Sequence, residues 1–279
     1  MTAAPPGAHG RQHLGPTPDR TRHPKRGGAR EFVVHSFDKS EPPQSAVTTN
    51  EILLTGARLL RREFARSPVR YGGREIAALA VADNDTIAMQ LVGGFGFSSC
   101  VLPNGHRAIL DILVPGDIAG LDRLVLNCPG EEFSLIGRTG YRALAAATLR
   151  SLMAEPSVAT YIMAAIAETR WRALRLAAAI GRLDAQGRLC VLLLDLHDRL
   201  RRCDLISRPS YNLPLTQEQL ADHLGLTLVH VNRTLRRLRE ERIAMVDRQV
   251  VVIQDMERLR HYAQGLPEPP EMPDPALSA

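Results

Sequence analysis

The sequence predicts an α+β fold made of an antiparallel β-sheet domain, a long helix, and a C-terminal helical unit that ends in a β-hairpin. Turn signals recur about every dozen residues between Ile87 and Ala145, a spacing typical of antiparallel sheets. After Pro156, apolar residues recur in alternating steps of four and three, as on a helix that packs along one seam. Between Pro214 and Ile253, two capped helices flank a glycine, and two β-rich stretches follow them.

The composition excludes several classes of protein. Of the 279 residues, 44% are hydrophobic and 23% are charged, so the chain is neither wholly disordered, collagen-like nor a disulfide-rich miniprotein. The net charge of +5 and the pI near 9.3 are compatible with a nucleic-acid partner. Aromatic residues make up only 4%, which argues against stacking platforms for single-stranded nucleic acid.

The N-terminal region divides into a tail and a helix. Residues 1–46 are rich in Pro, Gly, Ser and charge, so we expect a mostly disordered tail, and the tail has no apolar run that would form a secretory signal. Residues 49–66 have apolar side chains at helical spacing. Arginines here form either a solvated face or an added attraction for DNA: Arg58, Arg61, Arg62, Arg66, Arg70 and Arg74.

The sheet domain is expected over residues 47–154. Asn104-Gly105 is a strong hairpin turn because both residues tolerate a positive φ, and it joins Phe97–Leu102 to His106–Leu113. The other turn signals are Val92-Gly93-Gly94, Val114-Pro115-Gly116-Asp117 and Cys128-Pro129-Gly130. Such regular turns favour an antiparallel sandwich or barrel.

A long helix is expected over residues 155–182, with Gly181 able to end it. Its charged residues exclude a membrane span. The predicted seam is a dimer interface with coiled-coil spacing, formed by Ile162, Ile166, Thr169, Ala173, Leu176 and Ile180. The alternative is that this face packs on its own domain. A second amphipathic helix follows, with Leu189, Leu192, Leu193, Leu196 and Leu200 on one face.

The segment from 214 to 254 carries the functional signal. Thr216 and Gln219 form a capping box, Gly225 supplies the positive φ of a turn, and Thr227 caps the next helix. On that second helix Val231, Leu235 and Leu238 form the buried stripe. With two β-rich stretches joined at Asp247-Arg248, this predicts a winged helix-turn-helix within residues 183–265, followed by a Pro-rich tail at 266–279.

The exposed face of the second helix has the chemistry that reads duplex DNA. Amide and guanidinium groups contact base edges bidentately, and arginines also hold phosphates. Arg233 is expected to read a guanine, with Asn232, His230 and Val229 assisting. The full set of expected DNA contacts is Thr216, Gln217, Thr227, Val229, His230, Asn232, Arg233, Arg236 and Arg237. The alternative is an ordinary solvated basic face.

The residues resemble the Crp/Fnr family of bacterial transcription regulators. The most specific match is Leu215 to Thr227 followed by Val231 to Leu238, and Gly96 to Asp117 is similar to the family's roll of strands. The resemblance covers residues 48 to 263. It implies a cyclic-nucleotide-binding-like β-roll, a homodimer joined along the Pro156–Ile180 helix, and one recognition helix per protomer in successive major grooves.

Two departures from the family pattern change the expectation. The resemblance implies an Arg-Ser or Arg-Thr pair where a cyclic phosphate is held, but here Glu131-Glu132 would repel it, so no cyclic nucleotide and no cofactor is expected. The best-known members carry Arg and Glu where this chain has Leu228 and Val229, so the operator should differ.

The four cysteines suggest a reduced, cytoplasmic protein because none forms a C-x-x-C pair. Cys203 follows Arg199, Arg201 and Arg202 and is the candidate redox residue, although an idle thiol is the simpler interpretation. No hydrolase, P-loop or metalloprotease motif is present, so we expect no enzyme and no metal site.

The sequence therefore predicts a transcription regulator that binds double-stranded DNA as a homodimer on a pseudo-palindromic operator. RNA polymerase is an added partner if the protein activates transcription, and no membrane is expected. The alternative is a ligand- or partner-binding module with a β-roll, whose helix-turn-helix mediates protein contacts.

Overall fold

The computed structural model describes residues 48–72, 86–126, 130–267 and 272. It begins with α1 (Thr49–Arg66), where the Thr48 hydroxyl accepts from the Glu51 amide and the Glu51 carboxylate accepts from the Thr48 amide. The predicted tail at 1–46 lies outside the described residues. So do most of the C-terminal tail and the Cys128-Pro129 part of one expected turn.

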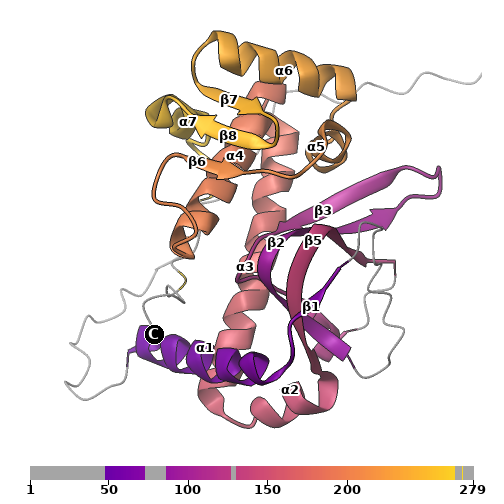
Figure 1. Cartoon of the computed structure of the whole chain (residues 1–279), viewed down its shortest axis with the longest axis vertical. Coiled ribbons are helices and arrows are strands. Elements are labelled where there is room, and N and C mark those ends of the chain that lie inside the picture. The colour runs from indigo at the N-terminus through magenta and orange to yellow at the C-terminus, as the bar shows by residue number, and fades with distance from the viewer. Residues whose placement is uncertain (1–47, 73–85, 127–129, 268–271, 273–279) are drawn as a thin grey trace, which may run out of the picture. The chain divides into compact units, whose positions relative to one another are not determined.

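Five of the described strands form one antiparallel sheet. Its central path is β1 (Arg70–Tyr71), β5 (Glu132–Ala145), β2 (Thr86–Val101) and β3 (Arg107–Leu113), and β4 (Ile118–Ala119) pairs with β2. A short 3₁₀ turn, η1 (Leu121–Leu124), follows β4. Figure 1 shows the sheet curving beside the long helix.

The expected turns at 104–105 and 114–117 are confirmed. The Leu102 amide donates to the His106 carbonyl across the Asn104-Gly105 turn, and the Asp117 carboxylate accepts from the Val114 amide at 2.7 Å. The turn expected at Val92-Gly93-Gly94 is wrong: β2 continues through it, with register shifts on both sides of Gly93. Gly94 has φ +83°, and a Cβ there would lie 2.3 Å from Thr139 Oγ1, so the glycines make a bulge that bends one long strand.

Helices α2 (Ala146–Leu152) and α3 (Pro156–Arg182) follow the sheet. Pro156 sits at the start of α3, where its missing N–H has no intrahelical partner to lose. Gly181 lies inside α3 rather than ending it, because the helix continues to Arg182.

One residue of the predicted dimer seam on α3 requires a correction, and the rest of the seam stays a prediction. Ile162 is 1% exposed and packs with Leu60, Phe64 and Val158 in the core between α1 and α3, so it cannot contact a partner. Ile166 and Leu176 are half-buried against their own protomer, whereas Thr169, Ala173 and Ile180 are exposed. The face of α3 that packs against α1 has the same alternating spacing of apolar residues as a dimer seam. The spacing alone therefore does not distinguish the two.

The exposed stripe of α3 lies one residue further along the chain. Met163 is 60% exposed and Leu174 is 48% exposed. Between and beyond them, Ala167, Arg170, Ala177 and Gly181 are exposed at the same alternating steps of four and three. We call these six residues the α3 stripe.

The C-terminal part begins with α4 (Ala185–Arg202), whose predicted leucine face is confirmed as buried. After it come β6 (Ser210–Asn212), α5 (Gln217–Leu224), α6 (Leu228–Glu240), β7 (Ala244–Asp247), β8 (Val250–Ile253) and α7 (Met256–Tyr262). β8 pairs with both β6 and β7. One apolar cluster joins the leucines of α4 to Phe97 and Ile112 of the sheet and to Leu220 and Val251 of the C-terminal part.

Candidate nucleic-acid interface

Helix α5 is fixed at both ends by the local chemistry that the sequence predicts. The Thr216 hydroxyl accepts from the Gln219 amide at 3.1 Å, and the Gln219 side chain accepts from the Thr216 amide at 2.8 Å. Gly225 ends the helix with φ +63°, a backbone conformation that costs free energy for any residue with a Cβ. Leu220, Ala221 and Leu224 are buried.

Helix α6 begins where the Thr227 hydroxyl accepts from the His230 amide. Val231 and Leu238 are 0% and 1% exposed, and Leu235 is half-buried, as the spacing predicts. Thr234 is also buried, which the spacing analysis missed; its hydroxyl donates to the His230 carbonyl, so the polar atom is satisfied. Thr234 lies three residues after Val231, and this helical spacing would have predicted that both lie on the buried face.

The opposite face of α6 is exposed and basic. Val229 is 65% exposed, and His230, Asn232, Arg233, Arg236 and Arg237 are exposed with it. Figure 1 shows α6 at the outer edge of the C-terminal part, with the β7–β8 hairpin beneath it. Thr216, Gln217 and Thr227, at the first residues of the two helices, are exposed as well.

The three arginines of this face differ in their partners. Arg237 Nε donates to Glu241 at 2.7 Å, and Glu241 also accepts from Arg258 and Gln186, so Arg237 belongs to a local network. These hydrogen bonds lower the pKa of the Glu241 carboxyl, and the bond from Arg237 contributes most. Arg236 lies 3.5 Å from Glu240 in an exposed pair. Within the described part of the chain, no ion pair or hydrogen bond involves the Arg233 side chain.

The wing places another arginine near the same surface. The Asp247-Arg248 junction is confirmed as part of a tight hairpin, in which Arg248 and Gln249 have φ of 46° and 66°. Arg248 is exposed at its tip, and sequence analysis did not select it as a site residue. A basic residue in a hairpin turn was the available signal.

The helix-turn-helix is attached to the sheet through α5. Arg107 of β3 donates to Asp222 at 2.7 and 2.9 Å, and His223 Nδ1 donates to the Ile109 carbonyl at 3.2 Å. A carbonyl oxygen only accepts, so Nδ1 carries the proton. Burial lowers the pKa of His223, while the Asp111 carboxylate opposes that shift.

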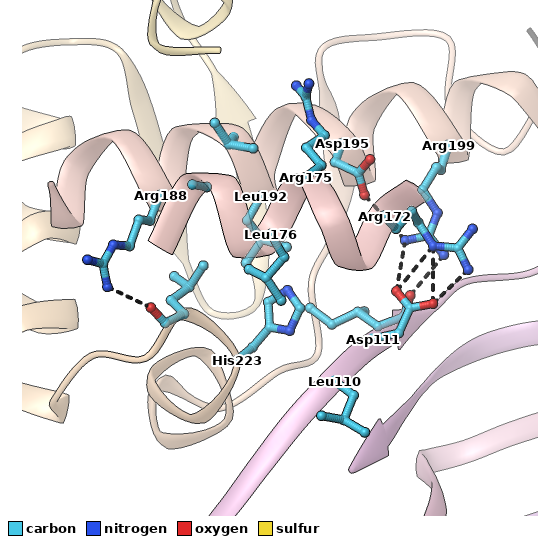
Figure 2. Close-up of a pocket in the computed structure, with 14 residues that line it drawn as sticks. Leu110, Asp111, Arg172, Arg175, Leu176, Arg188, Leu192, Asp195, Arg199 and His223 are labelled. Carbon is cyan, nitrogen blue, oxygen red and sulfur yellow. Dashed lines mark hydrogen bonds and ion pairs between the residues drawn. The ribbon is translucent and has the colours of Figure 1, made fainter. Parts of the chain in front are cut away.

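Figure 2 shows the charged junction behind this contact, where β3, α3 and α4 meet. Arg172 of α3 donates to Asp111 at 2.6 Å, and the same aspartate has its pKa lowered by Arg172 and Arg199 against a large opposing effect of burial. Arg199 of α4 donates to the Ile112 carbonyl and to Asp117. At the other end, Arg188 donates to the carbonyls of Ile180, Leu183 and Leu224, which ties the end of α3 to the turn after α5.

Comparisons with known proteins match the C-terminal part to a domain family and most of the chain to a transcription regulator. Residues 187–262 match the Crp-like helix-turn-helix domain family. The chain is 28% identical over 198 residues to the transcriptional activatory protein AadR of Rhodopseudomonas palustris, which covers 66% of this chain and 77% of that protein.

Among solved structures, FixK2 from Bradyrhizobium japonicum matches with a TM-score of 0.56 at 24% identity, covering 70% of this chain and 92% of that one. TTHB099, a transcriptional regulator of the CRP family from Thermus thermophilus, matches with a TM-score of 0.55 at 17% identity, covering 72% and 100%. The C-terminal part therefore carries a Crp-like helix-turn-helix domain, and the chain as a whole resembles transcription regulators of the Crp/Fnr family. The matched domain is of the helix-turn-helix kind, and the curated relative is named as a transcriptional activatory protein.

A cavity of about 220 Å³ lies between the sheet, η1 and α3, next to the segment where the Crp/Fnr pattern places a cyclic phosphate. Its walls include three acids, Asp111, Asp122 and Glu131, and two arginines, Arg170 and Arg172, of which Arg172 is already bound to Asp111. Burial, followed by the nearby Asp122, raises the pKa of Glu131. Three acids against one arginine that is not bound to an acid disfavour a cyclic phosphate in this cavity, and independence from cyclic nucleotides stays a prediction.

The remaining expectations concern cysteines, metals and membranes. Burial raises the pKa of Cys190 to about 12, so its thiol stays protonated. Cys203 is half-buried beside Gly116, and its redox role stays a prediction. Across the described ranges, no group of three or more His, Cys, Asp or Glu could hold a metal, and no helix is both long and apolar enough to cross a bilayer.

Proposed function

We propose that this Crp/Fnr regulator binds a pseudo-palindromic operator as a homodimer, with α6 of each protomer in the major groove. The observation that carries the proposal is the exposed face of α6, where Arg233 projects without an internal partner among the described residues. An unpaired guanidinium group is available for bidentate donation to a guanine without first breaking an ion pair.

The neighbouring side chains divide the remaining work. Val229 is exposed and apolar, which suits contact with a thymine methyl group. His230 and Asn232 supply hydrogen bonds, although Asn232 Nδ2 first has to leave the Leu228 carbonyl, to which it donates at 3.1 Å. This rearrangement makes Asn232 a weaker reader than Arg233.

Phosphate contacts would set the register. Arg237 uses Nε for Glu241, which leaves its terminal nitrogens free for a phosphate, and Arg236 is held only in an exposed pair. The exposed starts of α5 and α6, at Thr216, Gln217 and Thr227, present backbone N–H groups in the manner of phosphate-binding helix ends.

The proposed dimer contact is the α3 stripe. Met163 and Leu174 supply apolar area, and Ala167 and Ala177 let two helices approach closely. Arg170 is a polar residue within the stripe, a feature that fixes register and orientation in coiled coils. Thr169, Ala173 and Ile180 of the predicted seam flank the stripe and stay part of the proposal.

Other features of the proposal rest on less direct support. We infer a sheet domain at 47–154, a dimerisation helix at 155–182 and a winged helix-turn-helix at 183–265, since α3 spans Pro156–Arg182. A cytoplasmic location and independence from cyclic nucleotides complete the proposal. The related AadR is an activatory protein by name, which favours activation and therefore contact with RNA polymerase.

Selection of bound duplexes from a random library, followed by gel-shift titration at two salt concentrations, tests the proposal. We expect an enriched sequence with twofold symmetry and half-sites about 34 Å apart, with affinity that falls steeply as salt rises. Sedimentation of the free protein should give a dimer. Enrichment of a motif without symmetry, or a monomer that binds one half-site at full affinity, would contradict the homodimer.

A further inference from the structure

A groove of about 330 Å³ contains none of the residues of the DNA-binding face, and it has Ile118 in common with the cavity beside η1. It is formed where α1 and α3 leave the outer face of the sheet, and the end of α4 closes it with Cys203 and Leu205. Its volume is at the lower end of the range for small-molecule sites.

The sheet turns from apolar to polar at this groove. Ala88 of β2 pairs with Leu144 of β5, and both lie in the core beneath α1 and α3. Two residues along, Gln90 pairs with Arg142 on the same face, and Gln90 also pairs with Ile118 of β4. Gln90, Arg142 and Ile118 therefore form a row that opens into the groove.

The groove contains two cations that no acid of the described chain balances. Arg142 Nε is buried and has no hydrogen-bond acceptor, and Arg61 of α1 also lines the groove. Neither arginine has an ion pair or hydrogen bond within the residues that the structure describes, and none of the groove-lining residues is an Asp or Glu. Both arginines are half-buried, and a buried guanidinium N–H without an acceptor is costly, so an anion that accepted from Arg142 Nε would be stabilised here.

Two carboxylates that act on Tyr161 of the groove already have other partners. Asp117 accepts from Arg199 and from the Val114 amide, and Glu168 accepts from Arg202 at 3.0 Å. They are committed to other contacts. The positive charge of Arg61 and Arg142 is therefore not neutralised by these two carboxylates.

The remaining walls specify the rest of the ligand. Burial raises the pKa of the Tyr161 hydroxyl to about 12, so this group stays protonated and able to donate. Leu60, Leu91, Ile118 and Leu205 give the groove apolar surface beside the donors. A charged head with a short apolar chain matches both parts, and a planar carboxylate matches the fork of a guanidinium group.

We propose that the groove between α1, the outer face of the sheet and the end of α4 binds a small carboxylate with a short apolar chain, held by Arg61 and Arg142. The site is separate from the DNA-reading surface, so its occupancy is measured without DNA.

The test compares hexanoate, acetate and the neutral isostere hexanamide as probes of the full-length protein, with sodium chloride matching the ionic strength. Binding is followed by the rise of the melting temperature with concentration. Hexanoate should bind at least tenfold more tightly than either acetate or hexanamide, because it alone supplies both the charge and the buried chain.

Variants separate recognition from general effects. Arg142→Gln and Arg61→Gln should each weaken hexanoate about tenfold or more and remove its advantage over hexanamide, and Tyr161→Phe should weaken it less. Arg62→Gln, at the next and exposed position of α1, is the matched control and should bind as the natural chain does. Because the natural chain is itself titrated with all three probes, poor folding of a variant does not remove the test. Equal binding of hexanoate and hexanamide, or no binding of hexanoate, would overturn the proposal.

Discussion

Helices α3 and α6 both expose one face, but their sequences specify that face with different accuracy. On α6, the buried and exposed residues follow from the two flanking caps and the apolar spacing, and the structure agrees at Val231, Leu238 and Arg233. On α3, the same kind of spacing selects Ile162, which belongs to the protomer's own core. A helix held by local signals is predictable residue by residue, whereas a helix covered by a distant element needs the tertiary structure.

The largest expected effect tests the two faces of α3 at adjacent residues. Ile162→Ala should destabilise the protomer by about 2–5 kcal/mol because it leaves a cavity between α1 and α3. Met163→Ala should change the unfolding of the protomer by less than about 0.5 kcal/mol and instead weaken dimerisation. Denaturant unfolding at several protein concentrations, with sedimentation, measures both. If Ile162→Ala left protomer stability unchanged, the assignment of that residue to the core would be wrong.

On α6, Arg233→Ala should cost about 1–3 kcal/mol in operator binding and relax the preference at one position of each half-site. Arg236→Ala is the matched control, because loss of a phosphate contact should weaken all sequences alike and reduce the salt dependence. Affinities for single-base operator variants distinguish the two outcomes. Full sequence preference in Arg233→Ala would remove this residue from the base-reading set.

A smaller effect compares two threonines at different helix positions. Thr216→Ala should destabilise the protein by about 1 kcal/mol because the Gln219 amide loses its acceptor. Thr160→Ala should have little effect, because Thr160 is inside α3. Its hydroxyl donates to the Pro156 carbonyl, and that carbonyl still accepts its backbone hydrogen bond within the helix when the hydroxyl is removed. Thermal unfolding of both variants gives the difference, and equal losses would show that the cap is not what fixes α5.

The smallest effect concerns the contact between α5 and the sheet. Burial keeps the pKa of His223 below its unfolded value, so the unfolded chain takes up the proton first as the pH falls below about 6.5. Stability from the neutral imidazole is therefore fully present above that pH and is lost as the pH falls toward the folded pKa. His223→Gln should flatten this part of the stability profile, while the dependence caused by Asp111 lies below about pH 4. An unchanged slope in the variant would contradict the assignment.

The prediction from sequence succeeded where a few adjacent residues decide the outcome. The hairpin at Asn104-Gly105, the capping box at Thr216 and the glycine at 225 each act within one turn of chain. Gly93-Gly94 was misjudged because a glycine pair supports either a turn or a bulge, and the choice depends on Thr139 more than forty residues away.

The candidate site was predicted in the same uneven way. The exposed basic face of α6 follows from its periodicity, but the ion pair that occupies Arg237 involves Glu241 beyond the end of the helix. Arg61 and Arg142 line one groove although they are 81 positions apart, because α1 packs on the sheet. No spacing rule connects residues at that separation.

The apolar cluster that spans Phe97, the leucines of α4 and Val251 has a consequence for how the protein comes apart. The sheet and the C-terminal part share this interior, so neither loses its packing without exposing the other. A calorimetric scan should therefore show one cooperative heat-absorption peak. The winged part produced alone should be prone to aggregate, because the apolar face of α4 would be exposed to solvent.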